Sequence, residues 1–202
     1  LEATGVSKRF GAVVALEDVG IRVFPGKITG LVGDNGAGKS TLIKIISAVL
    51  RPDAGRIEYD GAPVSFASPA EARAAGIETV YQDLALAGNL SVWANIFLGR
   101  ERFAGPKALR MLDKRGMAAA ALGVAETRAV EEVIRELRAR GFGILMISHN
   151  LDQVFRLADE IWVMRRGRSI GHRLTAQTNP DEIVGMITGA ALLARTGGSG
   201  PA

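Results

Sequence analysis

The stretch of sequence that decides the fold is rich in glycine and ends on a lysine and two hydroxyl residues, Gly33-Asp34-Asn35-Gly36-Ala37-Gly38-Lys39-Ser40-Thr41. It fits the pattern G-x-x-x-x-G-K-[ST], in which glycines allow successive backbone N–H groups to turn toward one point and form an anion nest. A chain of this composition would match by chance about once in a hundred cases. The stretch therefore predicts a loop that binds the phosphates of a nucleotide.

The residues on either side of this loop form the strand, turn and helix that the pattern requires. The apolar run Lys27–Val32 predicts a buried strand. Apolar residues at helical spacing over Lys39–Leu50 predict a helix that continues until Pro52 stops it. No G-x-G-x-x-G dinucleotide fingerprint competes for this position. The flanking elements therefore support a true phosphate-binding loop over a chance match.

The loop assigns chemical roles to its last residues. Lys39 supplies a mobile positive charge for the β- and γ-phosphates, and the start of the following helix adds its positive dipole end. The hydroxyl of Ser40 is the expected Mg²⁺ ligand, and Thr41 adds a contact to the α-phosphate. The expected cofactors are ATP and Mg²⁺, and the loop residues from Gly33 to Thr41 are the expected cofactor-binding residues.

Strands and helices alternate along the rest of the chain, which predicts an α/β fold with a mainly parallel core sheet. The β-rich first third predicts an additional antiparallel β layer. The further strands are expected at Leu1–Val6, Val13–Val23, Gly55–Tyr59, Ile77–Tyr81, Gly143–Ser148, Glu160–Met164 and Arg168–Arg173. The further helices are expected after the capping residue Ser68 and over Ser91–Leu98, Gly105–Ala121, Glu126–Arg140, Asn150–Ala158 and Pro180–Thr188.

Composition narrows the possible functions. The chain has 202 residues, 48% hydrophobic and 23% charged, which suits one folded domain. It has no cysteine and only two histidines, without an H-E-x-x-H pair, so a thiolate metal site or a zinc hydrolase is not expected. The net charge of +4 is spread along the chain, so no nucleic-acid partner is expected. No apolar run reaches the roughly 18 residues of a membrane helix.

Further segments join the phosphate-binding loop in a recognisable series. They are Val6-Ser7-Lys8-Arg9-Phe10-Gly11, Tyr81-Gln82-Asp83, Ser91-Val92-Trp93-Ala94-Asn95-Ile96-Phe97-Leu98-Gly99, Ala121-Leu122-Gly123 and Ile147-Ser148-His149-Asn150. Together with the loop, they resemble the nucleotide-binding subunits of ABC transporters over nearly the whole chain. Within that family, two stretches, Ser91–Gly99 and Ser148-His149-Asn150, are similar to the carbohydrate-importer branch.

The resemblance implies roles for three residues outside the loop. Phe10 would stack on adenine, although taken alone, without the phosphate-binding loop, it would be interpreted as a core aromatic. Gln82 would ligate Mg²⁺ and sense the membrane subunit, although taken alone it would be a surface polar residue. His149 would contact the γ-phosphate, and it directly follows an apolar strand, at the sheet edge where ligands bind in open α/β folds. Gln82 and His149 are therefore the expected catalytic residues, and Ser40 and Gln82 the expected metal ligands.

Two segments that the family needs are absent. One is the signature of L-S-G-G-Q type, and the other is an apolar strand that ends in Asp and Glu. The chain passes directly from Ala120 to Ala121, which leaves an apparent gap and a truncated helical subdomain at about 91–120. Either the protein lacks these residues and binds ATP without hydrolysing it, or the parent protein contains them and the printed sequence omits them. The start at Leu1 instead of methionine favours the second explanation.

The resemblance also implies partners and a location. One ABC-type ATPase domain is expected over residues 1–190, followed by a disordered tail at 191–202. A second ATP-binding subunit, most simply another copy, would complete the ATP site, and transmembrane permease subunits would hold the pair at the cytoplasmic face of the membrane. An extracellular solute-binding protein would deliver the solute, which we expect to be a sugar. The alternatives are a non-catalytic nucleotide-binding module and a soluble ABC ATPase of translation or DNA repair.

Overall fold

The computed structural model describes residues 1–77, 103–104, 111–112 and 128–190. The chain divides into two compact units, one formed by Leu1–Thr79 with Leu137–Ala202 and the other by Val80–Glu136. The phosphate-binding loop belongs to the first unit. Within the described ranges, no helix has the length and apolar character needed to cross a bilayer. The predicted extent of one ATPase domain over 1–190 stays a prediction.

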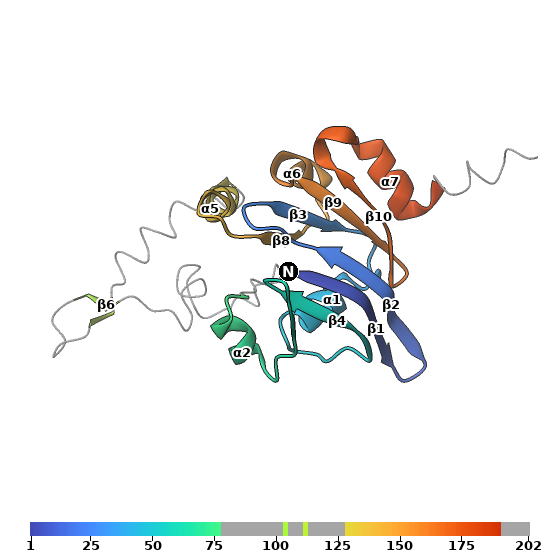
Figure 1. Cartoon of the computed structure of the whole chain (residues 1–202). Helices are drawn as coiled ribbons and strands as arrows, with labels where there is room; N and C mark the ends of the chain where they lie inside the picture. The colour runs from blue at the N-terminus through green and yellow to red at the C-terminus, as the bar shows by residue number, and fades with distance from the viewer. Residues whose placement is uncertain (78–102, 105–110, 113–127, 191–202) are drawn as a thin grey trace, which may run out of the picture. The chain divides into compact units, whose positions relative to one another are not determined.

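The core sheet of the first unit has the strand order β10-β9-β3-β8 (Figure 1). β3 (Ile28–Val32) runs parallel to β8 (Ile144–Ile147) and to β9 (Glu160–Arg165), whereas β10 (Arg168–Leu174) pairs with β9 antiparallel. Every residue of β3 is buried, as expected for a central strand covered on both faces. This confirms the predicted mainly parallel core sheet.

A second sheet has the order β2-β1-β4-β5 and is antiparallel throughout. Its strands are β1 (Glu2–Phe10), β2 (Val13–Arg22), β4 (Ala54–Tyr59) and β5 (Ala62–Val64). Val6 of β1 and Leu16, Val19 and Ile21 of β2 are fully or almost fully buried, whereas most of the other residues of these two strands are not. The predicted antiparallel layer is therefore confirmed, with one face of the sheet on the core and the other toward solvent.

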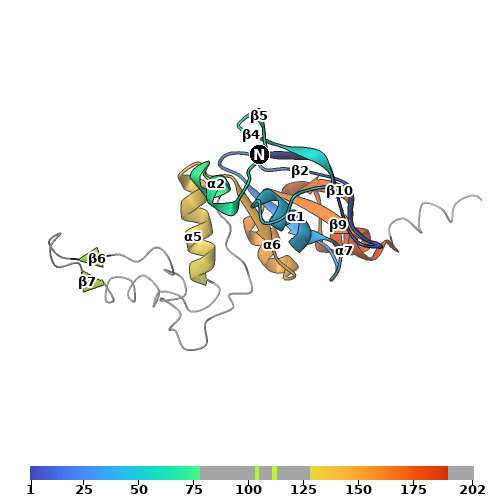
Figure 2. The same cartoon turned by 90° about the horizontal axis from the view of Figure 1, so that it is seen from below.

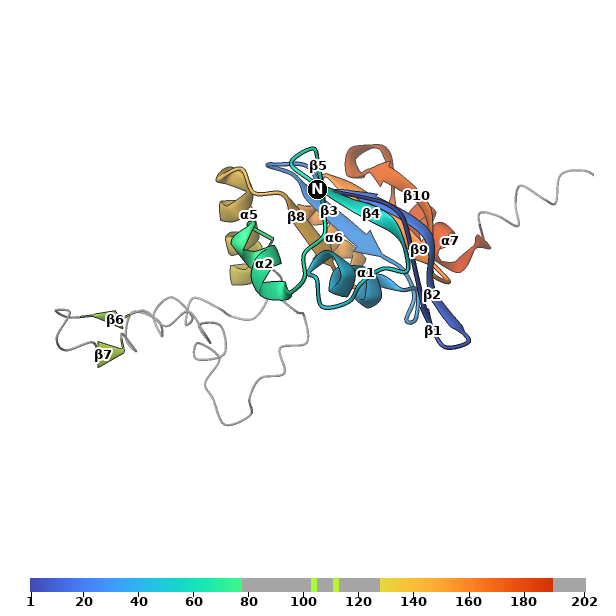
Figure 3. The same ribbon diagram turned by 60° about the horizontal axis from the view of Figure 1, so that its bottom comes forward.

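The hydrophobic core places helix α1 (Lys39–Ile46) between the two sheets. Leu42 and Ile45 of this helix form one buried cluster with Val6 and Leu16 of the antiparallel sheet and Leu31 of the core sheet. Figure 3 shows α1 beside the end of β3, with β1, β2 and β4 on the same side of the core sheet. The helix that follows the phosphate-binding loop is therefore fixed by burial on two sides.

Helices α6 (Leu151–Leu157) and α7 (Pro180–Thr188) lie on the other face of the core sheet (Figures 1 and 2). A Cβ atom on Gly30 would lie 2.7 Å from Cγ1 of Val154, so α6 can approach β3 this closely only over a glycine. The side chains of Asn150 and Asn179 cap α6 and α7 by accepting backbone N–H bonds. The core sheet is thus covered on both faces.

Helix α1 ends earlier than the sequence predicts. The apolar spacing predicted a helix as far as Leu50, but α1 stops at Ile46 and Ala48 takes a left-handed conformation with φ of 58°. The N–H groups of Val49 and Leu50 both turn back to the carbonyl of Lys44. A reverse turn at the helix end satisfies these groups, so the chain leaves the helix before Pro52 is reached.

The remaining short elements of the first unit are α2 and η1, a turn of 3-10 helix. α2 (Pro69–Ala74) starts with Ser68 as its N-cap, since the hydroxyl of Ser68 accepts the N–H of Glu71 at 3.4 Å, as predicted. η1 (Thr175–Gln177) connects β10 to α7.

The described parts of the second unit differ from the prediction in one place. The sequence predicted a helical segment over Gly105–Ala121, but β7 (Met111–Leu112) pairs antiparallel with β6 (Phe103–Ala104). Gly105 and Pro106 follow β6 directly, and both residues disfavour helix. Helix α5 (Arg128–Ala139) lies within the predicted helix Glu126–Arg140 and spans the boundary between the units. The predicted helix Ser91–Leu98 and all but Ile77 of the strand Ile77–Tyr81 lie outside the described residues.

Candidate functional site

The phosphate-binding loop connects the end of β3 to the start of α1, as predicted. Gly38 has a φ of 99°, and a Cβ atom there would lie 2.7 Å from the carbonyl oxygen of Ala15. A Cβ atom on Gly33 would collide with the carbonyl of Met164. Both positions therefore require glycine because the neighbouring backbone leaves no room for a side chain.

The loop leaves backbone N–H groups available to an anion. The N–H of Ala37 bonds to the carbonyl of Asp34 at 3.1 Å and closes the turn. Within the described part of the chain, no backbone carbonyl accepts the N–H groups of Gly38, Lys39 or Ser40. Helix α1 also has no side-chain N-cap and no acidic residue in its first turn. Unpaired donors and a positive helix end at one point fit a phosphate group.

Lys39 extends along the loop. Its Nζ donates hydrogen bonds to the carbonyl oxygens of Gly33 at 2.6 Å and Asp34 at 2.8 Å. Partial burial lowers the pKa of the Lys39 ammonium below its ordinary value, and the charge of Asp34 opposes that shift. The ammonium is thus held against the loop in a partly desolvated place, where it interacts more strongly with an added anion than it would in water.

The turn between β9 and β10 is hydrogen-bonded to the phosphate-binding loop. The N–H of Gly167 donates to the carbonyl of Ala37 at 3.1 Å, and the carbonyl of Gly167 accepts the N–H of Glu17 at 2.8 Å. Sequence reasoning predicted only a turn at residues 165–167 and missed this contact. Its one signal was the glycine itself, which has a φ of 77° and lies close to the backbone of Ala15.

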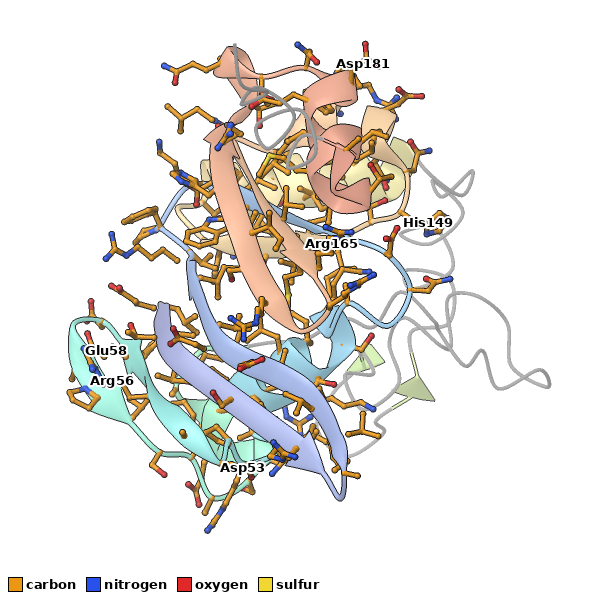
Figure 4. All side chains as sticks on the ribbon, turned by 90° about the vertical axis from the view of Figure 1, so that its right-hand side faces the viewer. Asp53, Arg56, Glu58, His149, Arg165 and Asp181 are labelled. Atoms are coloured by element: carbon orange, nitrogen blue, oxygen red, sulfur yellow. The ribbon has the colours of Figure 1, made fainter. Side chains whose placement is uncertain are left out.

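His149 lies at the same edge of the core sheet as the loop. Leu31 is paired in parallel register with Ile147, so the residue two places after each of them, Gly33 and His149, lies beyond the same ends of β3 and β8. The imidazole is exposed, and Figure 4 shows it projecting away from the ribbon. The structure therefore brings this predicted residue and the loop to one sheet edge.

The backbone around His149 is fixed on both sides. The hydroxyl of Ser148, which is buried, accepts the N–H of Asn150 at 3.1 Å and bonds to the Gln153 amide at 3.0 Å. The side chain of Asn150 in turn accepts the N–H of Gln153 at 3.1 Å and caps α6. The backbone that carries the imidazole is therefore fixed by hydrogen bonds, which suits a residue that contacts a ligand.

Phe10 lies at the last position of β1, opposite Val13 across the hairpin. Its side chain is 47% exposed, so the alternative that Phe10 is a core aromatic is wrong. The Nζ of Lys8 lies 5.9 Å from the centre of the ring. The exposed ring is available for stacking on a planar ligand.

The described residues contain no group of three or more His, Cys, Asp or Glu side chains that could hold a metal ion by themselves. Ser40 is exposed in the first turn of α1, and Thr41 follows it. A lone hydroxyl beside an anion nest fits Mg²⁺, which commonly takes only one or two protein ligands and completes its shell with phosphate oxygens and water. Gln82, the second predicted metal ligand, lies outside the described residues.

The other histidine, His172, lies on β10, opposite Trp162 of β9 and two strands from β3. The ring of His172 is 5.1 Å from the ring of Trp162, and its Nε2 is 3.7 Å from the carboxylate of Glu160. These partners lie on β9, and Glu160 is the residue at its amino end. The His172 side chain is 46% exposed.

The fold and the loop define a nucleotide-binding α/β protein of the phosphate-loop class. The family model for ABC transporter matches residues 16–155, and the chain belongs to that family. The chain is 39% identical to the xylose/arabinose import ATP-binding protein XylG of Sulfolobus acidocaldarius, with 95% of each chain covered. It is 38% identical to the fructose import ATP-binding protein FrcA of Rhizobium meliloti, with 94% of each covered.

A third relative is longer than this chain. The ribose import ATP-binding protein RbsA 1 of Rubrobacter xylanophilus is 36% identical over 95% of this chain, which spans only 47% of that relative. The alignments with XylG and FrcA run over 238 and 244 residues, more than the 202 residues of this chain. These relatives therefore contain residues without a counterpart here.

Solved structures agree on the fold. A nucleotide-free ATP-binding cassette from an ABC transporter superposes with a TM-score of 0.66 at 22% identity, covering 93% of this chain and 94% of that one. A second ATP-binding cassette of an ABC transporter gives a TM-score of 0.69 at 22% identity, with 96% of each chain covered. At this identity the likeness establishes the fold, and the predicted ABC-type ATPase fold is confirmed.

Proposed function

We propose that this chain is the ATP-binding subunit, or part of one, of an ABC importer that carries a sugar. The observation that supports this most directly is the phosphate-binding loop itself. Its backbone N–H groups are unpaired, the ammonium of Lys39 is bonded to the loop, and the N-terminus of α1 adds a positive partial charge. The relatives are ATP-binding proteins for the import of xylose or arabinose, fructose and ribose, which favours a sugar as the solute.

In this proposal the loop and the residues around it bind Mg²⁺-ATP. The N–H groups from Gly38 to Ser40 and the ammonium of Lys39 bind the phosphates, and the ring of Phe10 stacks on adenine. The hydroxyl of Ser40, together with Gln82, holds Mg²⁺, which when bound neutralises charge on the phosphate oxygens. His149, at the same sheet edge, donates a hydrogen bond to the γ-phosphate.

Hydrolysis needs more than this chain contains. In-line transfer of the γ-phosphoryl group to water depends on a residue that orients the water and on a carboxylate that keeps the metal in place. The family provides both on the apolar strand that is absent between Ala120 and Ala121. This absence favours the second candidate for the chain as printed, a module that binds ATP without turnover, whereas the parent protein with the segment is an ATPase.

The proposed partners follow from the same assignment. A second ATP-binding subunit completes the nucleotide site, and permease subunits hold the pair at the cytoplasmic face of the membrane. An extracellular solute-binding protein delivers the sugar, and no nucleic acid takes part. A soluble ABC ATPase of translation or DNA repair is the less favoured role, because the relatives described above are import proteins.

The test compares four proteins for Mg²⁺-ATP binding and phosphate release. They are the 202-residue chain, its Lys39→Ala variant, the chain with the family segment inserted between Ala120 and Ala121, and that longer chain with His149→Ala. We expect the printed chain to bind ATP with no phosphate release above the Lys39→Ala background. The longer chain should release phosphate in a His149-dependent way. Robust hydrolysis by the 202-residue chain would overturn the assigned mechanism.

A further inference from the structure

Lys8 lies two residues before Phe10 on β1, and its ammonium lies over the Phe10 ring. Its Nζ is 5.9 Å from the centre of the Phe10 ring, within the range of a cation–π contact. The Lys8 side chain is only 16% exposed, although lysine side chains usually extend into water. Lys8 is therefore held beside the ring.

Asp53 is the residue that holds Lys8. One carboxylate oxygen accepts the Lys8 ammonium at 2.6 Å, and the other accepts the backbone N–H of Arg9 at 2.7 Å. The N–H of Asp53 donates to the carbonyl of Ser7 at 2.9 Å. Figure 4 shows Asp53 beside the antiparallel sheet. Three bonds thus attach Asp53 to consecutive residues of β1, directly before Phe10.

The charge state of this contact is fixed at neutral pH. Hydrogen bonds from Lys8 and from the Arg9 backbone lower the pKa of the Asp53 carboxyl below its ordinary value. The carboxylate is therefore ionised wherever the protein is folded near pH 7. The ammonium keeps a negative partner on one side and the π face of the ring on the other.

Phe10 needs such a restraint. Its ring is 47% exposed at the end of a hairpin, where few contacts hold a side chain in one rotamer. A base that stacks on a freely rotating ring must first order that ring, which reduces affinity. A cation held against one part of the ring reduces this cost and leaves the remaining exposed surface for the base.

We propose that Lys8, held by Asp53, is a positioning residue that orients the Phe10 ring for stacking on the base of the nucleotide. The inference rests on the proposed function, because it assumes that Phe10 receives the base. It adds to that function two residues, from β1 and from the turn before β4, that determine how strongly the base contributes to binding.

The experiment measures the dissociation constants of Mg²⁺-ATP and of Mg²⁺ with inorganic triphosphate, which has no base to stack. Lys8→Met keeps the length of the side chain and removes the charge, and Asp53→Asn removes the ion pair. Arg56 and Glu58 form an equally short ion pair, 2.6 Å, on β4 of the same sheet, so Arg56→Met and Glu58→Gln are matched controls (Figure 4). Thermal denaturation checks that each variant is folded.

We expect Lys8→Met and Asp53→Asn to weaken ATP binding by about two- to fivefold, the size of an exposed cation–π contact. Triphosphate binding should not change, and the two control variants should leave both affinities unchanged. Lys8→Arg should restore ATP affinity, because a guanidinium keeps the charge and also packs on aromatic faces. In a Phe10→Ala background, Lys8→Met should have no further effect.

The outcomes separate this inference from the function on which it rests. If Phe10→Ala weakens ATP selectively and Lys8→Met does not, the inference is wrong and the proposed function stands. If Phe10→Ala weakens ATP and triphosphate equally, the assignment of Phe10 to the base is wrong, and the inference is wrong with it. Equal losses of ATP and triphosphate binding in Lys8→Met would mean that Lys8 acts on the phosphates and not through the ring.

Discussion

Replacement of Lys39 by alanine removes an ammonium group that the structure holds against the phosphate-binding loop. We expect Lys39→Ala to weaken ATP binding severely and to leave the fold intact. Lys39 is the first residue of α1 and lies outside the buried cluster that joins α1 to the two sheets. Nucleotide affinity and folding should therefore separate in this variant.

The expected size of the loss follows from the charges involved. Two unit charges about 4 Å apart interact with about 4 kcal/mol at the effective dielectric constant near a protein surface. Part of this is offset, because the ammonium already has hydrogen bonds to the carbonyls of Gly33 and Asp34. A net loss of about 2–4 kcal/mol corresponds to an increase of about 30- to 1000-fold in the dissociation constant.

The free energy of unfolding should change little. The variant loses two hydrogen bonds to carbonyl groups, but it also loses a partly buried charge whose pKa is lowered by that burial. These effects oppose each other, so we expect a net change of at most about 1 kcal/mol. Thermal denaturation without nucleotide measures this quantity.

The assay is calorimetric titration with Mg²⁺-ATP, and Lys44→Ala is the matched control. Lys44 is an exposed lysine in the last turn of the same helix, at the end opposite the loop. Its loss should leave the dissociation constant within about twofold, because the exposed Lys44 charge interacts with the phosphates through water, where the attraction between unit charges is weak. Unchanged affinity in folded Lys39→Ala, or an equal loss in Lys44→Ala, would refute the assignment of the loop.

Two further predictions concern the same loop. Gly38→Ala should lower the melting temperature and the ATP affinity together, because its Cβ atom would lie 2.7 Å from the carbonyl oxygen of Ala15. The Cβ atom of Gly36→Ala meets nothing within 4 Å, so this control should lose only about 1–2 kcal/mol through a strained left-handed backbone. Equal melting temperatures for the two variants would contradict this prediction. Because the folded state lowers the pKa of Lys39 below 10.5, the unfolded state binds more protons between the two values. Between the folded and unfolded pKa values of Lys39, the free energy of unfolding of the wild type, relative to that of Lys39→Ala, should therefore rise with pH. Over the same pH range the ATP affinity of the wild type should fall, because the ammonium loses its proton. Both quantities can be measured as a function of pH.

The sequence predicted the parts of the site whose chemistry requires particular residues. The loop from Gly33 to Thr41 was found because an anion nest needs glycines at fixed positions and a lysine at its end. The edge position of His149 was found because an all-apolar segment predicts a strand of a parallel sheet, whose carboxyl end faces the same edge as the loop. In both cases the information lies within a few neighbouring residues.

The sequence did not predict the residues that support the site, and the reason is physical. The atoms that fix Gly33 and Gly38 are carbonyl oxygens of Met164 and Ala15, and every residue has a carbonyl oxygen. Asp53 lies 45 residues from Lys8, and the motif Pro-Asp-Ala-Gly around it is explained equally well by a local turn. Such contacts depend on the register of β1 against β4, which local patterns do not determine. A ligand selects residue types and so leaves a pattern, whereas a supporting contact needs only an atom in the right place, and only a structure identifies it.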